Sequence, residues 1–423
     1  MDGEAEMKIG SSAMNNMEKG IVFLFSALPF IDMLNGIMSS TLPIGSIYKL
    51  LLCIVLLLNI LRINKCFSQK ALLVFLLVIS YVLFSIGFNV LFFNGEINTL
   101  DYPVKLLFNI ALLLLFVENY RICAISGNSL YLILDYSCWI MIACYLIPYV
   151  LGLGNTVYSG EMGYKGFFIA QNELGVNIVI LSFFAAFKLI NYFSPMDFIK
   201  LMLLVLCGVL LNTKTAIIAS FIAVCIWFFY ILRKGSFKVR WISIFLFIIG
   251  LLLLKDKIIS AVSNSILRYS TLQNKYYGGS VLTSILSGRN YNVQNAWQYL
   301  NEEHIIFRSI FGNGFCSDIL TEMDIIDIFF FLGIIGAVGA MIFIIWIFKK
   351  CCSNCKKDKT LLRPLSFIII CILSTLAGHV LFMAMSGCYF VIYCCFLMFY
   401  SSEQKDDGFR RNSNENISCY GYL

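Results

Sequence analysis

Long apolar runs separated by short polar segments make up most of the chain. Each run is about as long as a helix must be to cross the roughly 30 Å hydrocarbon layer of a bilayer. The runs predict transmembrane helices over residues 19–38, 44–61, 71–93, 104–117, 128–150, 173–190, 198–212, 216–232, 241–254, 323–348, 364–382 and 385–401. Barrel strands would show shorter segments of alternating polarity instead. We therefore expect an all-α integral membrane protein with about 12 transmembrane helices.

The composition indicates the same class. Of the 423 residues, 60% are hydrophobic and only 13% are charged, whereas a soluble domain has roughly 25% charged residues. Lipid must therefore cover most of the surface, and in lipid only helices and closed barrels satisfy every backbone polar group. The first apolar run has no small-residue cleavage pattern, which predicts a retained helix rather than a signal peptide.

Basic residues sort to one side of the predicted helices. One set of short connections holds most of the Lys and Arg residues, whereas the opposite short connections hold only Lys105, Lys165 and Lys214. Cytoplasmic loops are the basic ones, so we expect both termini inside, with cytoplasmic tails at 1–18 and 402–423. Because orientation accounts for the net charge of +7, we expect no nucleic-acid partner.

One connection, residues 255–322, is much longer than the others. It separates predicted helices one to nine, within 19–254, from predicted helices ten to twelve, within 323–401, and the orientation places it outside the cell. Long loops in a tightly connected domain are usually functional or disordered. Its aromatic and apolar residues favour a small folded cap over a poorly ordered spacer.

The sixteen cysteines do not indicate a disulfide framework. Most lie within predicted helices, where cysteine acts as a small hydrophobic residue, and only Cys316 lies in the long outer loop. The cluster of Cys351, Cys352 and Cys355 has a metal site or an acylation site as alternative readings, but three thiols without a nearby histidine are a weak zinc signal. There is no P-loop, dinucleotide fingerprint or paired Cys/His motif, so no metal and no cofactor is expected.

Polar residues gather near the predicted outer ends of the helices, where charges are costly and often functional. They are Asp32, Asn35, Lys165, Asn172, Lys214, Glu322, Asp324, Asp327 and His379. Each has an ordinary structural alternative, such as a lysine reaching the membrane surface or acids in an interfacial turn. As a group, the cations suit phosphate or pyrophosphate, and the acids and the histidine could take a proton from a hydroxyl.

Several ordered segments carry a resemblance to a known family. They are Lys165–Gly175, Asn212–Thr215, Ser287-Gly288-Arg289, residues 311–315 (Phe-Gly-Asn-Gly-Phe), Glu322–Asp327 followed by Gly333 and Gly336, and Gly378-His379. Together they resemble segments of the O-antigen and capsular polysaccharide polymerases, in the O-antigen polymerase and ligase superfamily. The resemblance covers residues 160–395, and the part before it matches only in topology. No single motif carries it, because the family diverges heavily.

The resemblance implies an inverting glycosyltransferase in the plasma (inner) membrane of a bacterium. Such enzymes join undecaprenyl-pyrophosphate-linked oligosaccharide repeat units at the outer leaflet. The hydroxyl of one lipid-linked unit attacks the anomeric carbon of another lipid-linked chain, and undecaprenyl pyrophosphate leaves. No divalent metal is implied, so protein cations must neutralise the leaving group. A chain-length regulator and a flippase are the further partners to be expected.

The resemblance also suggests which residues hold the substrate. Arg289 corresponds to the loop arginine of the family and is assigned to pyrophosphate or glycan contact. Lys165 and Lys214 take the same role, with Asn172, Arg268 and Arg308 as further substrate-binding candidates. Related polymerases and ligases often have arginine where this chain has Lys214. Lysine keeps the charge but loses the bidentate fork, which makes that assignment less secure.

The catalytic base is predicted among Glu322, Asp324 and Asp327, with His379 as the second choice. If the acids open a helix, Asp324 and Asp327 lie three residues apart on one face, while Glu322 lies off it.

Two other classes of function remain. A ligase of the same superfamily would use the same donor chemistry and a different acceptor. A flippase would transport the lipid-linked oligosaccharide, and predicts charges along a central cavity together with a repeated half. The chain shows no internal repeat and places its charges on one side, which makes a flippase, or a non-enzymatic scaffold, less favoured than a polymerase.

Overall fold

The structure, a computed structural model, describes most of the chain between residues 14 and 400. The described ranges are 14–38, 43–63, 67–93, 101–157, 163–191, 193–234, 288–302, 305–315, 319–358, 362–376, 378–379 and 383–400, with isolated positions between 237 and 286. The helix predicted over 241–254 lies largely outside these ranges, as do both predicted tails and Arg268.

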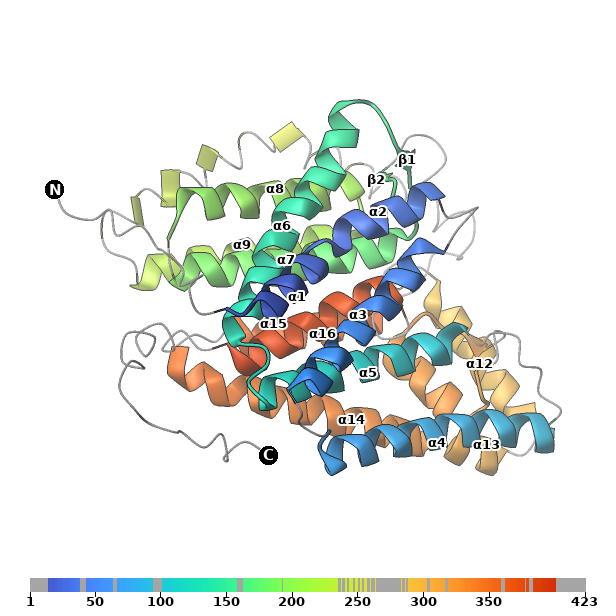
Figure 1. The fold of residues 1–423 in the computed structure, drawn as a ribbon. Helices are drawn as coiled ribbons and strands as arrows, with labels where there is room; N and C mark the ends of the chain where they lie inside the picture. The colour runs from blue at the N-terminus through green and yellow to red at the C-terminus, as the bar shows by residue number, and fades with distance from the viewer. Residues whose placement is uncertain are drawn as a thin grey trace.

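The described residues are almost entirely helical, in agreement with the predicted class (Figure 1). The first helices are α1 (Asn16–Ser26), α2 (Leu28–Met38), α3 (Ile44–Arg62), α4 (Gln69–Phe93), α5 (Asp101–Arg121), α6 (Gly127–Val150), α7 (Gln171–Asn191), α8 (Pro195–Leu211) and α9 (Lys214–Lys234). The later helices are α12 (Arg289–Glu302), α13 (Ile305–Phe311), α14 (Asp324–Asp358), α15 (Leu362–Leu376) and α16 (Ala384–Phe399). Strands β1 (Asn155–Thr156) and β2 (Tyr164–Gly166) form one short antiparallel pair between α6 and α7.

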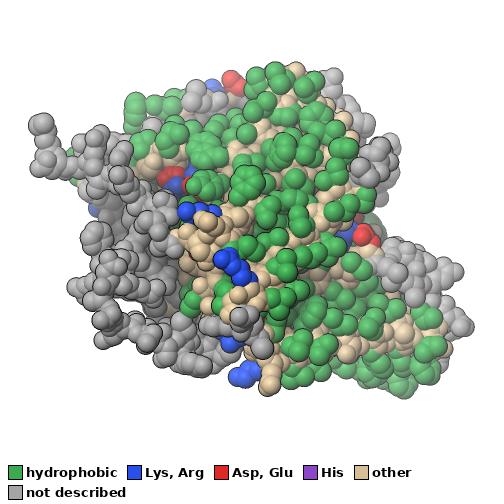
Figure 2. Space-filling model, viewed as in Figure 1, with side chains coloured by type: hydrophobic (Ala, Val, Ile, Leu, Met, Phe, Trp, Pro, Cys, Tyr) green, Lys and Arg blue, Asp and Glu red, His purple; other side chains and the backbone are tan. Residues whose placement is uncertain are grey.

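The helices identify a multi-pass membrane protein. Among the described residues, six helices are long and apolar enough to cross a membrane, and α1 with α2 makes a seventh candidate if the bent pair is one span. Two further apolar helices, α15 and α16, are shorter. Hydrophobic side chains cover most of the face of the bundle seen in Figure 2. The prediction of an all-α membrane protein is thus confirmed, whereas the predicted number of about 12 membrane-crossing helices is not established.

The predicted helix over 19–38 is two helices in the structure. The chain bends by 44° between α1 and α2, at Ala27. Pro29 lies in the first turn of α2. Because proline has no N–H and its ring collides with the carbonyl four residues earlier, it prevents α1 from continuing unbroken.

Helix α7 lies in the interior of the bundle. In its most apolar stretch 83% of the residues are buried, against 11% for α4. It packs against α6, α8, α9 and α16, and the beginnings of α7, α14 and α16 meet at one end of the bundle. We call this the site end. Helix α4 lies at the edge of the bundle (Figure 1), where lipid must cover it.

Several buried charges within the bundle are paired with an opposite charge. Near the site end, Lys49 of α3 lies 2.8 Å from the carboxylate of Asp32 of α2. At the other end of α7, Lys188 lies 3.0 Å from Asp135 of α6 and 2.8 Å from Asp197 of α8, and Lys200 of α8 joins the same group. An unpaired charge at such positions would be strongly destabilising, so these pairs link helices and need no catalytic role.

Candidate functional site

A cavity of about 330 Å³ opens at the site end. Its polar lining comes from four separate segments: the start of α5, the β2–α7 segment, the residues before α14, and the connection between α15 and α16. The lining residues that the argument below uses are Tyr102, Lys165, Asn172, Glu173, Glu322 and His379. The cavity therefore brings together residues from three of the polar segments that the sequence singled out, Lys165–Gly175, Glu322–Asp327 and Gly378-His379, whereas Asp32, Asn35 and Lys214 are not part of its described lining.

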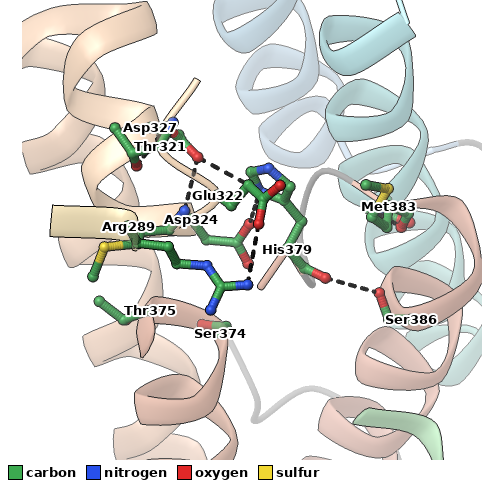
Figure 3. A network of polar contacts seen from close by, with 12 residues as sticks. Arg289, Thr321, Glu322, Asp324, Asp327, Ser374, Thr375, His379, Met383 and Ser386 are labelled. Carbon is green, nitrogen blue, oxygen red and sulfur yellow. Dashed lines mark hydrogen bonds and ion pairs between the residues drawn. The ribbon is translucent and has the colours of Figure 1, made fainter. Parts of the chain in front are cut away.

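His379 is the buried basic group of this cavity. It lies after the end of α15 at Leu376, and not within a helix reaching residue 382 as the apolar run predicted. Its Nδ1 atom lies 3.1 Å from Oδ1 of Asp324 and 3.6 Å from Oδ2 of Asp327 (Figure 3). A carboxylate on one ring nitrogen fixes the tautomer and the orientation of the imidazole.

The charges around His379 set its protonation. Burial alone lowers the pKa of His379, but the hydrogen bond to Asp324 and the negative charges of Asp324 and Asp327 raise it. The second effect is larger, so the pKa lies above its ordinary value of 6.5. A histidine in this setting takes up a proton readily and is stabilised once it has done so.

Asp327 mainly organises the turn that precedes α14. Its Oδ1 atom accepts hydrogen bonds from the backbone N–H and the hydroxyl of Thr321, at 2.7 and 2.8 Å. Its Oδ2 atom accepts from the N–H of Met323 at 3.0 Å. Glu322, between these two donors, has a φ of 60°. The carboxylate of Asp327 thus holds a strained turn that points Glu322 into the cavity.

Arg289 reaches the same place from α12. Its Nη2 atom lies 3.1 Å from Oε2 of Glu322, and in Figure 3 its guanidinium points toward Glu322 and His379. The arginine side chain is 10% exposed and that of Glu322 is 49% exposed. A buried guanidinium paired with an accessible carboxylate can exchange that carboxylate for another anion.

The β2–α7 segment forms the opposite wall. Asn172 lies close to Gly378, where a Cβ would be 3.2 Å from its side-chain nitrogen. Lys165 donates to the carbonyl of Ile169 at 3.2 Å. Glu173 accepts a hydrogen bond from the N–H of Met385, in the first turn of α16, at 3.1 Å. This wall therefore holds both ends of the segment that carries His379.

Sequence reasoning did not single out two of these lining residues. Glu173 lies in the Lys165–Gly175 segment that carried the resemblance, and an acid beside Asn172 at the start of a helix was a readable signal. Tyr102, whose ring centroid lies 5.7 Å from that of His379, had no such signal. Its ring offers an apolar face to the cavity.

Two predicted substrate-binding residues lie elsewhere, and a third is not described. Lys214 is the first residue of α9 and does not belong to the described lining of the cavity. Arg308 is buried, donates to the carbonyl of Tyr299 at 3.1 Å and lies over the ring of Tyr299. Arg268 falls outside the described residues. The structure thus places Lys165 and Asn172 in the lining of the cavity, links Arg289 to that lining through Glu322, and gives Arg308 a local partner.

Within the described part of the chain, no group of three or more His, Cys, Asp or Glu side chains could hold a metal ion. Cys351 and Cys352 lie near the end of α14, and Cys351 is buried.

Comparison with protein families gives one match. Residues 270–404 match the sequence model of the family described as O-antigen ligase like membrane protein. This segment contains Arg289, Glu322, Asp324 and His379, whereas the wall formed by α5 and α7 precedes it. The match supports a relation to the O-antigen polymerase and ligase superfamily, and with it an O-antigen-related process at a membrane. It does not separate polymerases from ligases. No match was found among curated proteins.

Proposed function

We propose that this protein polymerises lipid-linked oligosaccharide repeat units into O-antigen or capsular polysaccharide by inverting glycosyl transfer. The observation that carries the proposal is the His379–Asp324 pair at a cavity whose lining residue Glu322 is bonded to Arg289. A base and an anion-binding group at one place are what the transfer of a sugar from a pyrophosphate requires. The substrate is an undecaprenyl-pyrophosphate-linked oligosaccharide, and the membrane is the plasma membrane of a bacterium with the site end facing outward.

In this reaction His379 is the base. Its Nε2 atom takes the proton from the acceptor hydroxyl as that oxygen attacks the anomeric carbon. The bond between this carbon and the phosphate oxygen breaks, undecaprenyl pyrophosphate leaves with the bonding electrons, and the configuration inverts. Asp324, at Nδ1, stabilises the imidazolium that forms. General base catalysis by a positioned side chain typically raises the rate of a reaction by roughly 10²–10⁴-fold.

Arg289 receives the departing pyrophosphate. A guanidinium binds phosphate oxygens bidentately and keeps its charge at every relevant pH. In the structure Glu322 forms an ion pair with that guanidinium, and its side chain is half exposed. The pyrophosphate therefore displaces Glu322, and the released carboxylate faces the sugar. Lys165 lies on the opposite wall, and with Asn172 and Glu173 it can contact sugar hydroxyls.

A ligase is the second candidate, because the matching family is described by that activity. It would use the same base, the same leaving group and a different acceptor. A chain-length regulator and a flippase are the further partners that polymerisation would need.

The proposal is tested by the length of surface glycans in a strain that lacks this gene, complemented with the wild-type chain or a His379→Ala variant. His304, the only other histidine, supplies the matched control His304→Ala. We expect single repeat units without the gene and with His379→Ala, and a full ladder with the wild type and the control. A normal ladder held on the carrier lipid would indicate a ligase. Repeat units trapped on the cytoplasmic side would indicate a flippase and contradict the catalytic proposal.

A further inference from the structure

Helix α14 is interrupted at Gly333, and the chain from α13 fills the interruption. Gly333 has φ 65° and ψ −168°, outside the helical region. The three carbonyls before it accept hydrogen bonds from other segments. Phe330 accepts from the N–H of Asn313 at 2.8 Å, Phe331 from the N–H of Gly314 at 3.1 Å, and Leu332 from the Tyr81 hydroxyl of α4 at 2.6 Å.

Glycines allow this contact between two backbones. A Cβ on Gly312 would lie 2.1 Å from the carbonyl oxygen of Phe331, and one on Gly333 would lie 2.2 Å from that of Ile310. A Cβ on Gly314 would lie 2.8 Å from the Asn89 side chain of α4. The residues 311–315 that contributed to the family resemblance are thus wedged between α4 and α14.

The position of residues 311–315 along the axes of α4 and α14 follows from their contacts with these two helices. Ser85, whose hydroxyl donates to the carbonyls of Phe311 and Phe331, lies eight residues before the end of α4 at Phe93. At 1.5 Å per residue this is about 12 Å along the helix axis. Phe331 lies seven residues into α14, about 10 Å from its start. Both helices are membrane-span candidates, and a distance of about 10–12 Å along such a helix is roughly a third of a hydrocarbon layer of roughly 30 Å.

The outward face of α13 has the composition of a lipid contact. Ile305, Ile306 and Phe307 are 44%, 69% and 53% exposed. Phe84 of α4 is 46% exposed, and its ring centroid lies 5.4 Å from that of Phe311. The apolar face of α13 therefore continues the lipid-facing surface of α4. In water such a patch would be unfavourable.

Arg308, the one charged residue of α13, is turned away from this face. It is 5% exposed and bonded to the carbonyl of Tyr299 in α12. A charge on a lipid-facing surface is costly unless it is paired or reaches a polar region. The inward placement of Arg308 leaves the outward face of α13 apolar.

From these contacts we infer that residues 305–315 form a re-entrant element, which enters the leaflet at the site end between α4 and α14 and contacts its acyl chains. Irregular backbone occurs at such depth only where protein satisfies its polar groups. Here the N–H groups of Asn313 and Gly314 bond to carbonyls of α14, and hydroxyls of α4 bond to the remaining carbonyls at the interruption. The segment predicted as an outer loop thus contains a membrane-embedded part. Helix α12 is held at the membrane surface by it, with Arg289 at the depth of the lipid head groups.

The inference is tested by the reaction of single added cysteines with a charged, membrane-impermeant maleimide. The variants are Ile306→Cys, Tyr291→Cys in α12, where the native tyrosine is 42% exposed, and Phe84→Cys as an embedded reference. Both sides of the membrane are exposed to the reagent. Mass spectrometry measures how many more maleimide labels each variant carries than the parent chain. Phe307→Cys replaces Ile306→Cys if the latter does not accumulate.

We expect Tyr291→Cys to gain one label in membranes. Ile306→Cys and Phe84→Cys should gain none there and one after denaturation in detergent. Equal reaction at Tyr291 and Ile306, whether high or low, would overturn the inference. The measurement needs no substrate, so it stands or falls independently of the proposed glycosyl transfer.

Discussion

Nδ1 of His379 lies 3.1 Å from Oδ1 of Asp324, although the two residues are 55 positions apart in the chain. Asp324 opens α14 and His379 follows α15, so the contact depends on the packing of these two helices at the site end. It joins two motifs that the sequence presented separately, the acids before α14 and the Gly378-His379 pair. The contact also assigns different tasks to acids that looked equivalent, because Asp324 pairs with the histidine while Asp327 holds the preceding turn.

The first prediction separates Asp324 from Asp327. Asp327→Ala leaves the buried N–H groups of Thr321 and Met323 without their acceptor. Each such loss costs about 1–3 kcal/mol, so we expect reduced thermal stability in detergent. Asp324→Asn keeps a hydrogen-bonding group of the same shape and should unfold near the wild-type temperature with much lower activity. Equal stability of Asp327→Ala and the wild type would contradict the role given to Asp327.

The second prediction concerns pH. His379 accepts a proton only when neutral, and its neighbours raise its pKa above 6.5. The rate should therefore fall as the pH drops through this raised value. Asp324→Asn removes a charge that raises the pKa, so the inflection should move to lower pH while the maximum rate declines. The measurement is the pH profile of the initial rate for the two proteins. An inflection that Asp324→Asn leaves in place would assign it to another group.

The third prediction concerns the pair of Arg289 and Glu322. Arg289→Ala should abolish activity with expression intact, and Arg289→Lys should retain part of it, because lysine keeps the charge without the fork. Glu322→Gln removes the competitor of the pyrophosphate, so KM for the lipid-linked donor should fall. If Glu322 acts only as this competitor, kcat stays near the wild-type value.

Steady-state kinetics in detergent check the third prediction, with Arg308→Lys as an arginine control outside the cavity. A large loss of kcat in Glu322→Gln would give Glu322 a direct part in the reaction. Full activity of Arg289→Ala would remove Arg289 from the site.

The helices were predictable because lipid requires long apolar runs, and α3, α4, α6 and α9 begin and end within a few residues of those runs. The break at Ala27 was readable in principle from Pro29. The end of α15 at Leu376 was not, since the apolar residues continue past it. Helices stop where tertiary contacts favour another path, and here the path leads His379 to Asp324.

The candidate site was predictable as a set of residue types and not as a geometry. Arg289, Asp324 and His379 were named from the sequence, but their roles were not separable there. Asp324 and Asp327 share a helix face, and their partners distinguish them: His379 for Asp324, and the N–H groups of Thr321 and Met323 for Asp327. Tyr102 shows the same limit, because this residue of α5 is placed in the cavity by helices remote in sequence.

The most direct test uses the purified protein in liposomes with lipid-linked repeat units taken from the strain that lacks the gene. The account predicts products with two or more repeats on one carrier, and one undecaprenyl pyrophosphate released for each bond formed. The His379→Ala variant should form neither, and His304→Ala should form both. Unchanged repeat units that only move between the two leaflets would contradict it.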